Sequence, residues 1–216
     1  MREAGVKSHA SSRRSWSRLF ASVLFAAIAV LMAMGGYLLK ERQIRDQQEA
    51  LNNIDIPFLQ SMRVHHDQAI TLAASLLESR HPTIRQLAHE VYNTQLQETG
   101  VMRGLLISWN APQTPTGPLW EWMVRDADEQ TIEFVSRCRS GGKMPGMLDQ
   151  DEFNALFTAK GEVRDKLFVL HMMAHHQAAI AMTRHAAQHA NSSAVRTLAA
   201  TMLTAQRKEL LVLGKL

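Results

Sequence analysis

The chain has 216 residues, a formal net charge of +4 and a single cysteine, so an internal disulfide is excluded. The positive charge belongs to the first 45 residues, which hold eight basic and two acidic side chains, whereas the other residues hold 16 and 18. The chain beyond residue 45 is therefore slightly acidic, and the sequence predicts no nucleic-acid partner.

Residues 19–39 form an uncharged apolar run that is long enough to cross a bilayer as a helix. Arg13, Arg14 and Arg18 precede this run, and the positive-inside rule then places residues 1–18 in the cytoplasm as a basic tail. We expect a single-pass anchor in the inner or plasma membrane, a helical stalk over residues 40–54, and a periplasmic or extracellular domain. The competing interpretation is a cleaved signal peptide, whose apolar region is usually shorter, about 7–15 residues.

The exported part, residues 55–216, shows helical periodicity throughout. Residues 55–109 read as a first helical hairpin, because apolar side chains recur at three- and four-residue steps on both sides of the break at His81-Pro82. Residues 165–216 read as a second hairpin with its turn at Asn191. No period-2 strand pattern occurs, so the sequence predicts an all-α fold: a ferritin-like four-helix bundle from two duplicated hairpins, preceded by one transmembrane helix.

The segment between the hairpins, residues 110–164, is expected to be a long crossover. It begins with a proline-rich loop, continues as a helix over residues 119–139, and ends with a short helix capped by Asp149. Cys138 lies in this segment. In an oxidising compartment it is either a buried small hydrophobic side chain or a thiol that pairs between chains.

The two hairpins carry the same pattern of methionine, paired histidines, glutamine and glutamate. The matched residues are Met62 and Met172, His65 and His175, His66 and His176, Gln95 and Gln206, and Glu98 and Glu209. The spacing is 110 residues for the first three pairs and 111 for the last two, which one extra residue in the second intra-repeat loop would explain. A duplication of this kind indicates two equivalent sets of candidate ligands.

Helical geometry predicts where these side chains point. His66 falls near the centre of the apolar stripe of its helix, whereas His65 lies towards one flank. Glu98 shares the apolar stripe of the partner helix, where an unpaired carboxylate would be costly. We therefore expect His66 close to Glu98, and His176 close to Glu209. A structural hydrogen-bonded pair explains this pattern as well as a metal site does.

The second repeat carries a further stripe along one helix face. Its members are His171, His175, Met182, His185 and His189. His171/His175 and His185/His189 are i,i+4 pairs, a spacing that can chelate a metal ion from one helix. The alternative is an exposed polar face. Imidazole together with thioether favours copper over magnesium or calcium, which prefer oxygen ligands.

At these positions the sequence resembles the ferritin-like family catalogued as domain of unknown function 305. That family has Phe-x-x-x-Met-x-x-His-His-x-x-Ala and a later Gln-x-x-Glu-x-x-x-Met in each half. The matching residues here are Phe58, Met62, His65, His66, Ala69, Gln95, Glu98 and Met102, then Phe168, Met172, His175, His176, Ala179, Met182, Gln206 and Glu209. Asp55, Asp165 and Gly146-Met147-Leu148 also fit, whereas Leu72 and Leu213 replace expected methionines.

The resemblance implies an exported, often membrane-tethered helical protein, and some members are associated with copper binding and copper tolerance. The sequence thus predicts a membrane-anchored, extracytoplasmic protein that binds, buffers or delivers copper. The candidate ligands are Met62, His65, His66, Glu98, His171, Met172, His175, His176, Met182, His185, His189 and Glu209.

Two other functions remain open. The first is a metal-free structural or interaction module at the membrane, and homo-oligomerisation is open in either case. The second is a di-metal oxidase, which needs about four carboxylates and two Glu-x-x-His motifs, and the sequence has no Glu-x-x-His. No arrangement typical of a catalytic nucleophile is visible, which favours a protein that is not an enzyme.

Overall fold

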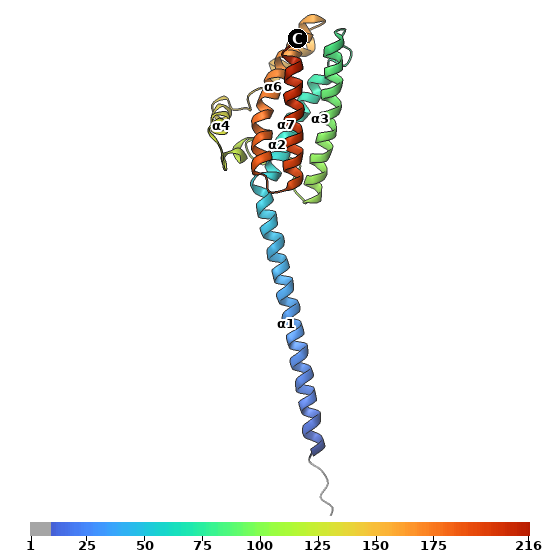
Figure 1. The fold of residues 1–216 in the computed structure, drawn as a ribbon, viewed down its shortest axis with the longest axis vertical. Coiled ribbons are helices and arrows are strands. Elements are labelled where there is room, and N and C mark those ends of the chain that lie inside the picture. The colour runs from blue at the N-terminus through green and yellow to red at the C-terminus, as the bar shows by residue number, and fades with distance from the viewer. Residues whose placement is uncertain (1–9) are drawn as a thin grey trace, which may run out of the picture. The chain divides into compact units, whose positions relative to one another are not determined.

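The computed structural model describes residues 10–216, with side chains from residue 21 onward. Figure 1 shows the chain as a series of helices: α1 (Ala10–Asn53), α2 (Asp55–Ala74), α3 (Pro82–Ser108), the 3-10 helix η1 (Glu121–Val124), α4 (Glu129–Gly141), α5 (Gln150–Thr158), α6 (Glu162–His189) and α7 (Ser193–Leu213). Between residues 10 and 216 there is no strand, so the all-α class is confirmed. The chain divides into two compact units, residues 1–47 and 48–216.

The first unit consists of most of α1. Among the described residues, it contains the one helix that is long and apolar enough to span a membrane. Its apolar side chains, such as Phe25 and Leu39, are exposed, as in a helix whose surface faces lipid. The helix continues through residues 40–53, the predicted stalk. The predicted basic tail, residues 1–18, lies outside the part of the chain with described side chains.

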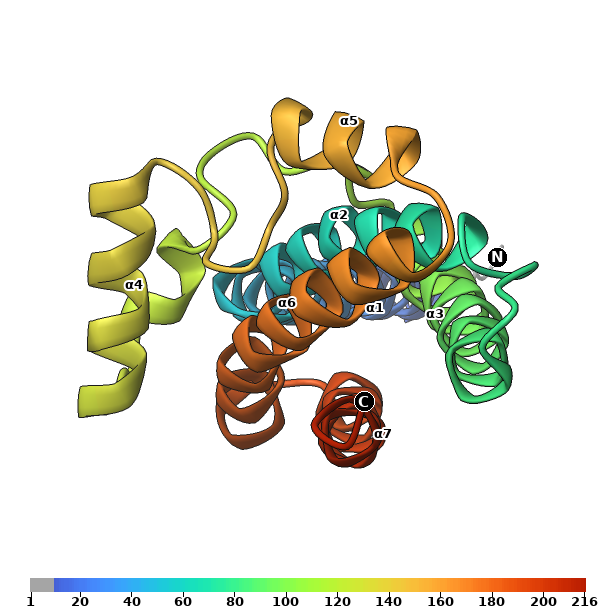
Figure 2. The same ribbon diagram turned by 90° about the horizontal axis from the view of Figure 1, so that it is seen from above.

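The second unit contains the two predicted hairpins. Helix α2 packs against α3, α6 packs against α7, and the hairpins meet through α2 and α6. Viewed from above, α2 and α6 lie side by side, with α3 and α7 on the outside (Figure 2). The apolar stripes expected from the sequence are the buried faces: Phe58, Met62 and Ala69 of α2 are fully buried, as are Phe168 and Met172 of α6.

Each hairpin has one aspartate that accepts hydrogen bonds from the turn of the other hairpin. The Asp55 carboxylate accepts hydrogen bonds from the backbone N–H groups of Asn191 and Ser192, at 2.9 and 2.7 Å. In the matching position of the other hairpin, the Asp165 carboxylate accepts a hydrogen bond from the Ser79 hydroxyl at 2.8 Å. These reciprocal bonds align the two hairpins and fix the level at which α2 meets α6.

The crossover differs from the predicted one. The single helix expected over residues 119–139 is wrong: η1 and α4 are separate, and Asp126 between them has a left-handed backbone with φ of 55°. The cause is local, since the Asp128 side chain accepts a hydrogen bond from the Thr131 N–H and so starts a new helix.

Cys138 of α4 is buried, and burial raises the pKa of its thiol to about 12, so it packs as a small hydrophobic residue.

Residues 146–148, near the end of the crossover, pack directly against α2 and α6. Gln68 of α2 bonds both the N–H and the C=O of Leu148, at 2.7 and 3.0 Å. Gly146, with φ of +81°, approaches α6 so closely that a Cβ atom would lie 2.2 Å from the Ala174 carbonyl oxygen. Only glycine fits there. The short helix α5 then begins at Asp149 with a capping box to Glu152, as the sequence predicted.

Candidate metal centre

Each hairpin contains one buried histidine–glutamate pair. His66 Nε2 lies 2.7 Å from a carboxylate oxygen of Glu98, and His176 Nε2 lies 2.5 Å from one of Glu209. Both rings are fully buried, while 11% and 12% of the two glutamate side chains is exposed. The two pairs join α2 to α3 and α6 to α7, as the apolar stripes predicted. Each is a short hydrogen bond to a charged group, which is the stronger class of hydrogen bond.

The other histidine of each pair lies at the interface between the hairpins. The rings of His65 and His175 contact each other in a tilted arrangement, with centroids 3.6 Å apart and planes at 35°. His175 Nε2 donates to the backbone carbonyl of His65 at 3.0 Å. The sequence placed His65 towards a flank, but it is fully buried because α6 covers that flank of α2.

These contacts join six side chains into one polar cluster across the bundle, which we call the histidine core: His65, His66, Glu98, His175, His176 and Glu209. Within each hairpin the neighbouring rings lie 6.4 Å apart (His65 and His66) and 6.1 Å apart (His175 and His176). The core therefore runs from one glutamate to the other through four buried imidazoles. Each hairpin contributes two histidines and one glutamate, as the duplicated sequence pattern does.

Many polar atoms of this region have no protein partner. They are both ring nitrogens of His65, the Nδ1 atoms of His66, His175 and His176, and the side-chain amides of Gln95 and Gln206. Buried polar groups in folded proteins are nearly always satisfied, and an unsatisfied one costs roughly 1–3 kcal/mol. The unpartnered imidazole nitrogens are the donor type that copper and zinc bind. The two glutamines stand in the repeated pattern but were not among the predicted ligands.

Two rings of the core, those of His65 and His175, favour the neutral form. Burial, and then the neighbouring histidines, hold the pKa values of His65 and His175 well below their ordinary range. A neutral imidazole keeps a lone pair for a metal ion without first releasing a proton. His65 and His175 are therefore neutral at neutral pH.

The predicted stripe of α6 is not a solvated face. His175, Met182 and His185 are buried, while His171 and His189 are half-buried. These histidines also cannot share a single metal site, because ten residues of helix place His175 about 15 Å from His185. The His185 and His189 rings form a separate pair, 4.7 Å apart. Burial, with His189 as the next cause, lowers the pKa of His185 to about 4.

The predicted methionine ligands lie in the hydrophobic interior. Met62 and Met182 are fully buried in one apolar cluster, and Met172 is fully buried in another. In the part of the chain with described side chains, no three His, Cys, Asp or Glu groups converge so that they could hold one ion. The imidazoles of the histidine core are the donor type that transition metals bind, but the described side chains do not form a closed set of ligands in this arrangement.

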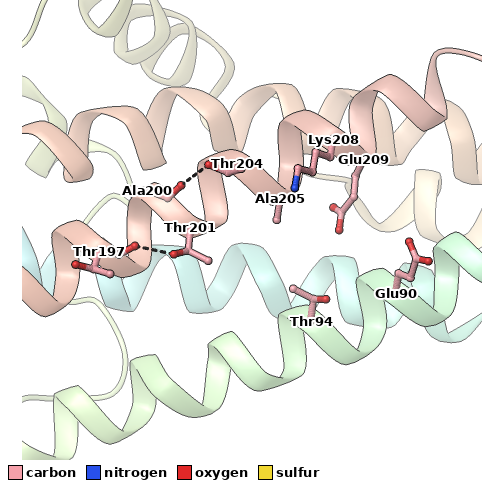
Figure 3. A pocket seen from close by; sticks show the side chains of 9 residues that line it. All are labelled: Glu90, Thr94, Thr197, Ala200, Thr201, Thr204, Ala205, Lys208 and Glu209. Atoms are coloured by element: carbon pink, nitrogen blue, oxygen red, sulfur yellow. Dashed lines mark hydrogen bonds between the residues drawn. The ribbon is translucent and has the colours of Figure 1, made fainter.

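One residue of the core, Glu209, also lines a surface groove. The groove has a volume of about 780 Å³ and lies between α3 and α7. Threonines and alanines line it together with three charged side chains, Glu90, Lys208 and Glu209. Figure 3 shows Glu90 of α3 and Glu209 of α7 pointing into this groove from opposite sides. Since Glu209 also bonds His176, its carboxylate connects the groove to the buried rings.

Comparison with known proteins finds one matching family and several solved structures of similar fold. A family model described as "Domain of unknown function (DUF305)" matches residues 55–216. A DUF305 protein from Streptomyces coelicolor is 25% identical with a TM-score of 0.62, and the alignment covers 73% of this chain and 87% of that one. A DUF305 fragment from Deinococcus radiodurans is 30% identical with a TM-score of 0.57, covering 74% and 95%. The protein CopM in its Cu(I)-bound form is 22% identical with a TM-score of 0.55, covering 74% and 93%. No curated protein matches the chain.

Proposed function

The chain belongs to the family described as domain of unknown function 305, and on that premise we propose that its helical bundle binds copper in the histidine core. The protein would act as a buffer or carrier of the ion outside the cytoplasm, held at the membrane by residues 19–39. Copper is the cargo in this proposal and not a resident cofactor.

One observation carries the proposal. The core contains four fully buried imidazoles, of which His66 and His176 each bond a glutamate through Nε2 and keep an unpartnered Nδ1. One histidine–glutamate bond per hairpin would be enough to join its helices. The adjacent rings of His65 and His175 add nitrogen donors at the hairpin interface that such a structural role does not require. Imidazole is a ligand for copper, zinc and iron, and not for the hard alkaline-earth ions.

The comparisons support copper as the first ion to test. CopM is known in Cu(I)-bound and Cu(II)-bound forms and shares the fold of this chain. The carboxylates argue against the di-metal oxidase, because that chemistry needs about four of them. In the histidine core there are two, Glu98 and Glu209, and each already bonds a histidine.

Copper titration of the full-length protein in detergent tests the proposal. The informative variant is His65→Phe/His175→Phe, which keeps two aromatic rings at the interface and removes four ring nitrogens. We expect it to lose high-affinity copper binding in calorimetry while its helical circular dichroism is unchanged. The control is His89→Phe, because His89 is an exposed histidine of α3. If the core variant binds copper as tightly as the parent, the core is structural and the metal-free module becomes the better interpretation.

A further inference from the structure

The histidine pair at the C-terminal end of α6 lies outside the histidine core. His185 is 1% exposed and His189, one turn later, is half-buried. Their ring centroids are 4.7 Å apart, with planes at 36°. Two imidazoles four residues apart on a helix are a recurrent chelating arrangement for a transition metal.

The His185 ring is held as a metal ligand usually is. A hydrogen bond with the backbone of Arg125 engages the ring, while its Nε2 atom is buried and has no partner. Ligating histidines commonly use one nitrogen for a backbone carbonyl or carboxylate and present the other to the ion. The backbone of the crossover therefore orients this ring and leaves one nitrogen available.

The crossover covers His185, and Arg184 bonds it to α6 beside that ring. Arg184 contacts the Asp128 carboxylate at 3.2 Å and the Thr131 hydroxyl at 3.4 Å, and it also bonds Gln130. Asp126 and Asp128 are close enough for their charges to act on the His185 ring. Asp126 has a left-handed backbone, which is uncommon for a residue with a side chain. Asp126 and Asp128 thus place negative charge near the ring, and the Arg184 guanidinium offsets part of the charge of Asp128.

The pair is absent from the first hairpin. At the same spacing of 110 residues, His185 and His189 correspond to Ser75 and Ser79. Both serines already have structural partners: the Ser75 hydroxyl donates to the Leu72 carbonyl, and the Ser79 hydroxyl donates to Asp165. The histidines are therefore not part of the duplicated framework that builds the core.

We propose that His185 and His189 form a second metal site, separate from the histidine core, that binds a borderline divalent ion, Cu(II) or Zn(II). The two imidazoles are the protein ligands, and water completes the coordination on the side of Asp126 and Asp128. The proposal does not rest on copper binding in the core, since the two sites share no ligand.

Trp122 provides a reporter for this site, because its ring lies 5.6 Å from that of His185. Paramagnetic Cu(II) bound to the histidine pair should quench Trp122 fluorescence, and diamagnetic Zn(II) should compete and restore it. The measurement uses full-length protein in detergent, with Trp122→Phe to identify the share of the signal that Trp122 contributes. We expect half-maximal quenching of that share to need at least tenfold more Cu(II) in His189→Ala.

Two controls separate the sites. His89→Ala removes an exposed histidine of α3 and should leave the quenching curve unchanged. His65→Phe/His175→Phe should also leave it unchanged, whether or not the core binds copper. The proposal is overturned if Cu(II) does not quench Trp122, if His189→Ala quenches like the parent, or if the core variant alone abolishes the effect. Since His189 is half-buried, its replacement does not require a new core, and an unchanged circular dichroism spectrum confirms the fold.

Discussion

The rings of His65 and His175 lie 3.6 Å apart although 110 residues separate them in the chain. The two residues occupy the same place in the duplicated pattern, so the repeats meet at their equivalent histidines. This contact excludes water from both rings. Neither ring bonds a carboxylate, because Glu98 and Glu209 bond His66 and His176 instead. The result is a pair of neutral imidazoles between two histidine–glutamate pairs.

The stability of the metal-free protein should fall in mild acid. Burial lowers the pKa of His65 and of His175 in the folded state, whereas in the unfolded chain both take up protons near 6.5. The unfolded state therefore binds more protons below that pH, and the free energy of unfolding decreases as pH falls through 6.5 towards the lowered values. Each ring contributes at most about 1.4 kcal/mol per pH unit. Above pH 7 this contribution is constant.

Urea unfolding between pH 8 and pH 4.5 measures this dependence. His185 adds to the same slope, because its pKa is lowered to about 4. In His65→Phe/His175→Phe the decline should be shallower, since two of the titrating groups are gone. A parent protein whose stability stays constant or rises from pH 7 to pH 5 would contradict the assignment of neutral buried rings.

The His66–Glu98 pair should show energetic coupling. Glu98→Leu leaves His66 Nε2 without its partner at 2.7 Å and should cost about 1–3 kcal/mol. The double variant His66→Leu/Glu98→Leu removes both partners and should cost less than the sum of the single variants. Chemical unfolding of the four proteins gives the coupling energy. Additive single effects would show that the bond contributes no net stability.

Gly146 should be much less tolerant of a side chain than Gly142. Both have a left-handed backbone, with φ of +81° and +68°, and each should lose about 1–2 kcal/mol on replacement by alanine for that reason alone. At Gly146 the new Cβ would also meet the Ala174 carbonyl oxygen at 2.2 Å, whereas at Gly142 nothing lies within 4 Å. Gly146→Ala should therefore lower the melting temperature well beyond Gly142→Ala. Equal losses would mean that the crossover can move off α6 freely.

We expect residues 19–39 to be retained in the mature protein as a membrane anchor. Residues 19–39 have the length of a spanning helix, and the apolar side chains described there are exposed. Mass spectrometry of protein purified from its native membrane should detect residues 19–39 as part of the mature chain. A mature N-terminus after residue 30 would identify a cleaved signal peptide instead, with a soluble exported domain.

The sequence by itself determined the helices and their buried faces, because the 3.6-residue period of apolar side chains is a local property. It also predicted the histidine–glutamate pairs: His66 and Glu98 lie on facing stripes of two helices that a short turn forces together. The prediction of one helix over residues 119–139 was wrong. Periodicity does not show that the Asp128 side chain caps a new helix at that point.

The tertiary structure alone decided which histidines meet across the hairpins. The contact between the His65 and His175 rings depends on how α2 lies against α6. The reciprocal bonds of Asp55 and Asp165, each between residues more than 80 positions apart in the chain, fix that arrangement. Likewise, the stripe of α6 could have been solvated, and only the folded crossover covers His185 and brings Trp122 against it. Helical periodicity tells which side chains share a face, but the element that covers the face is set by long-range packing.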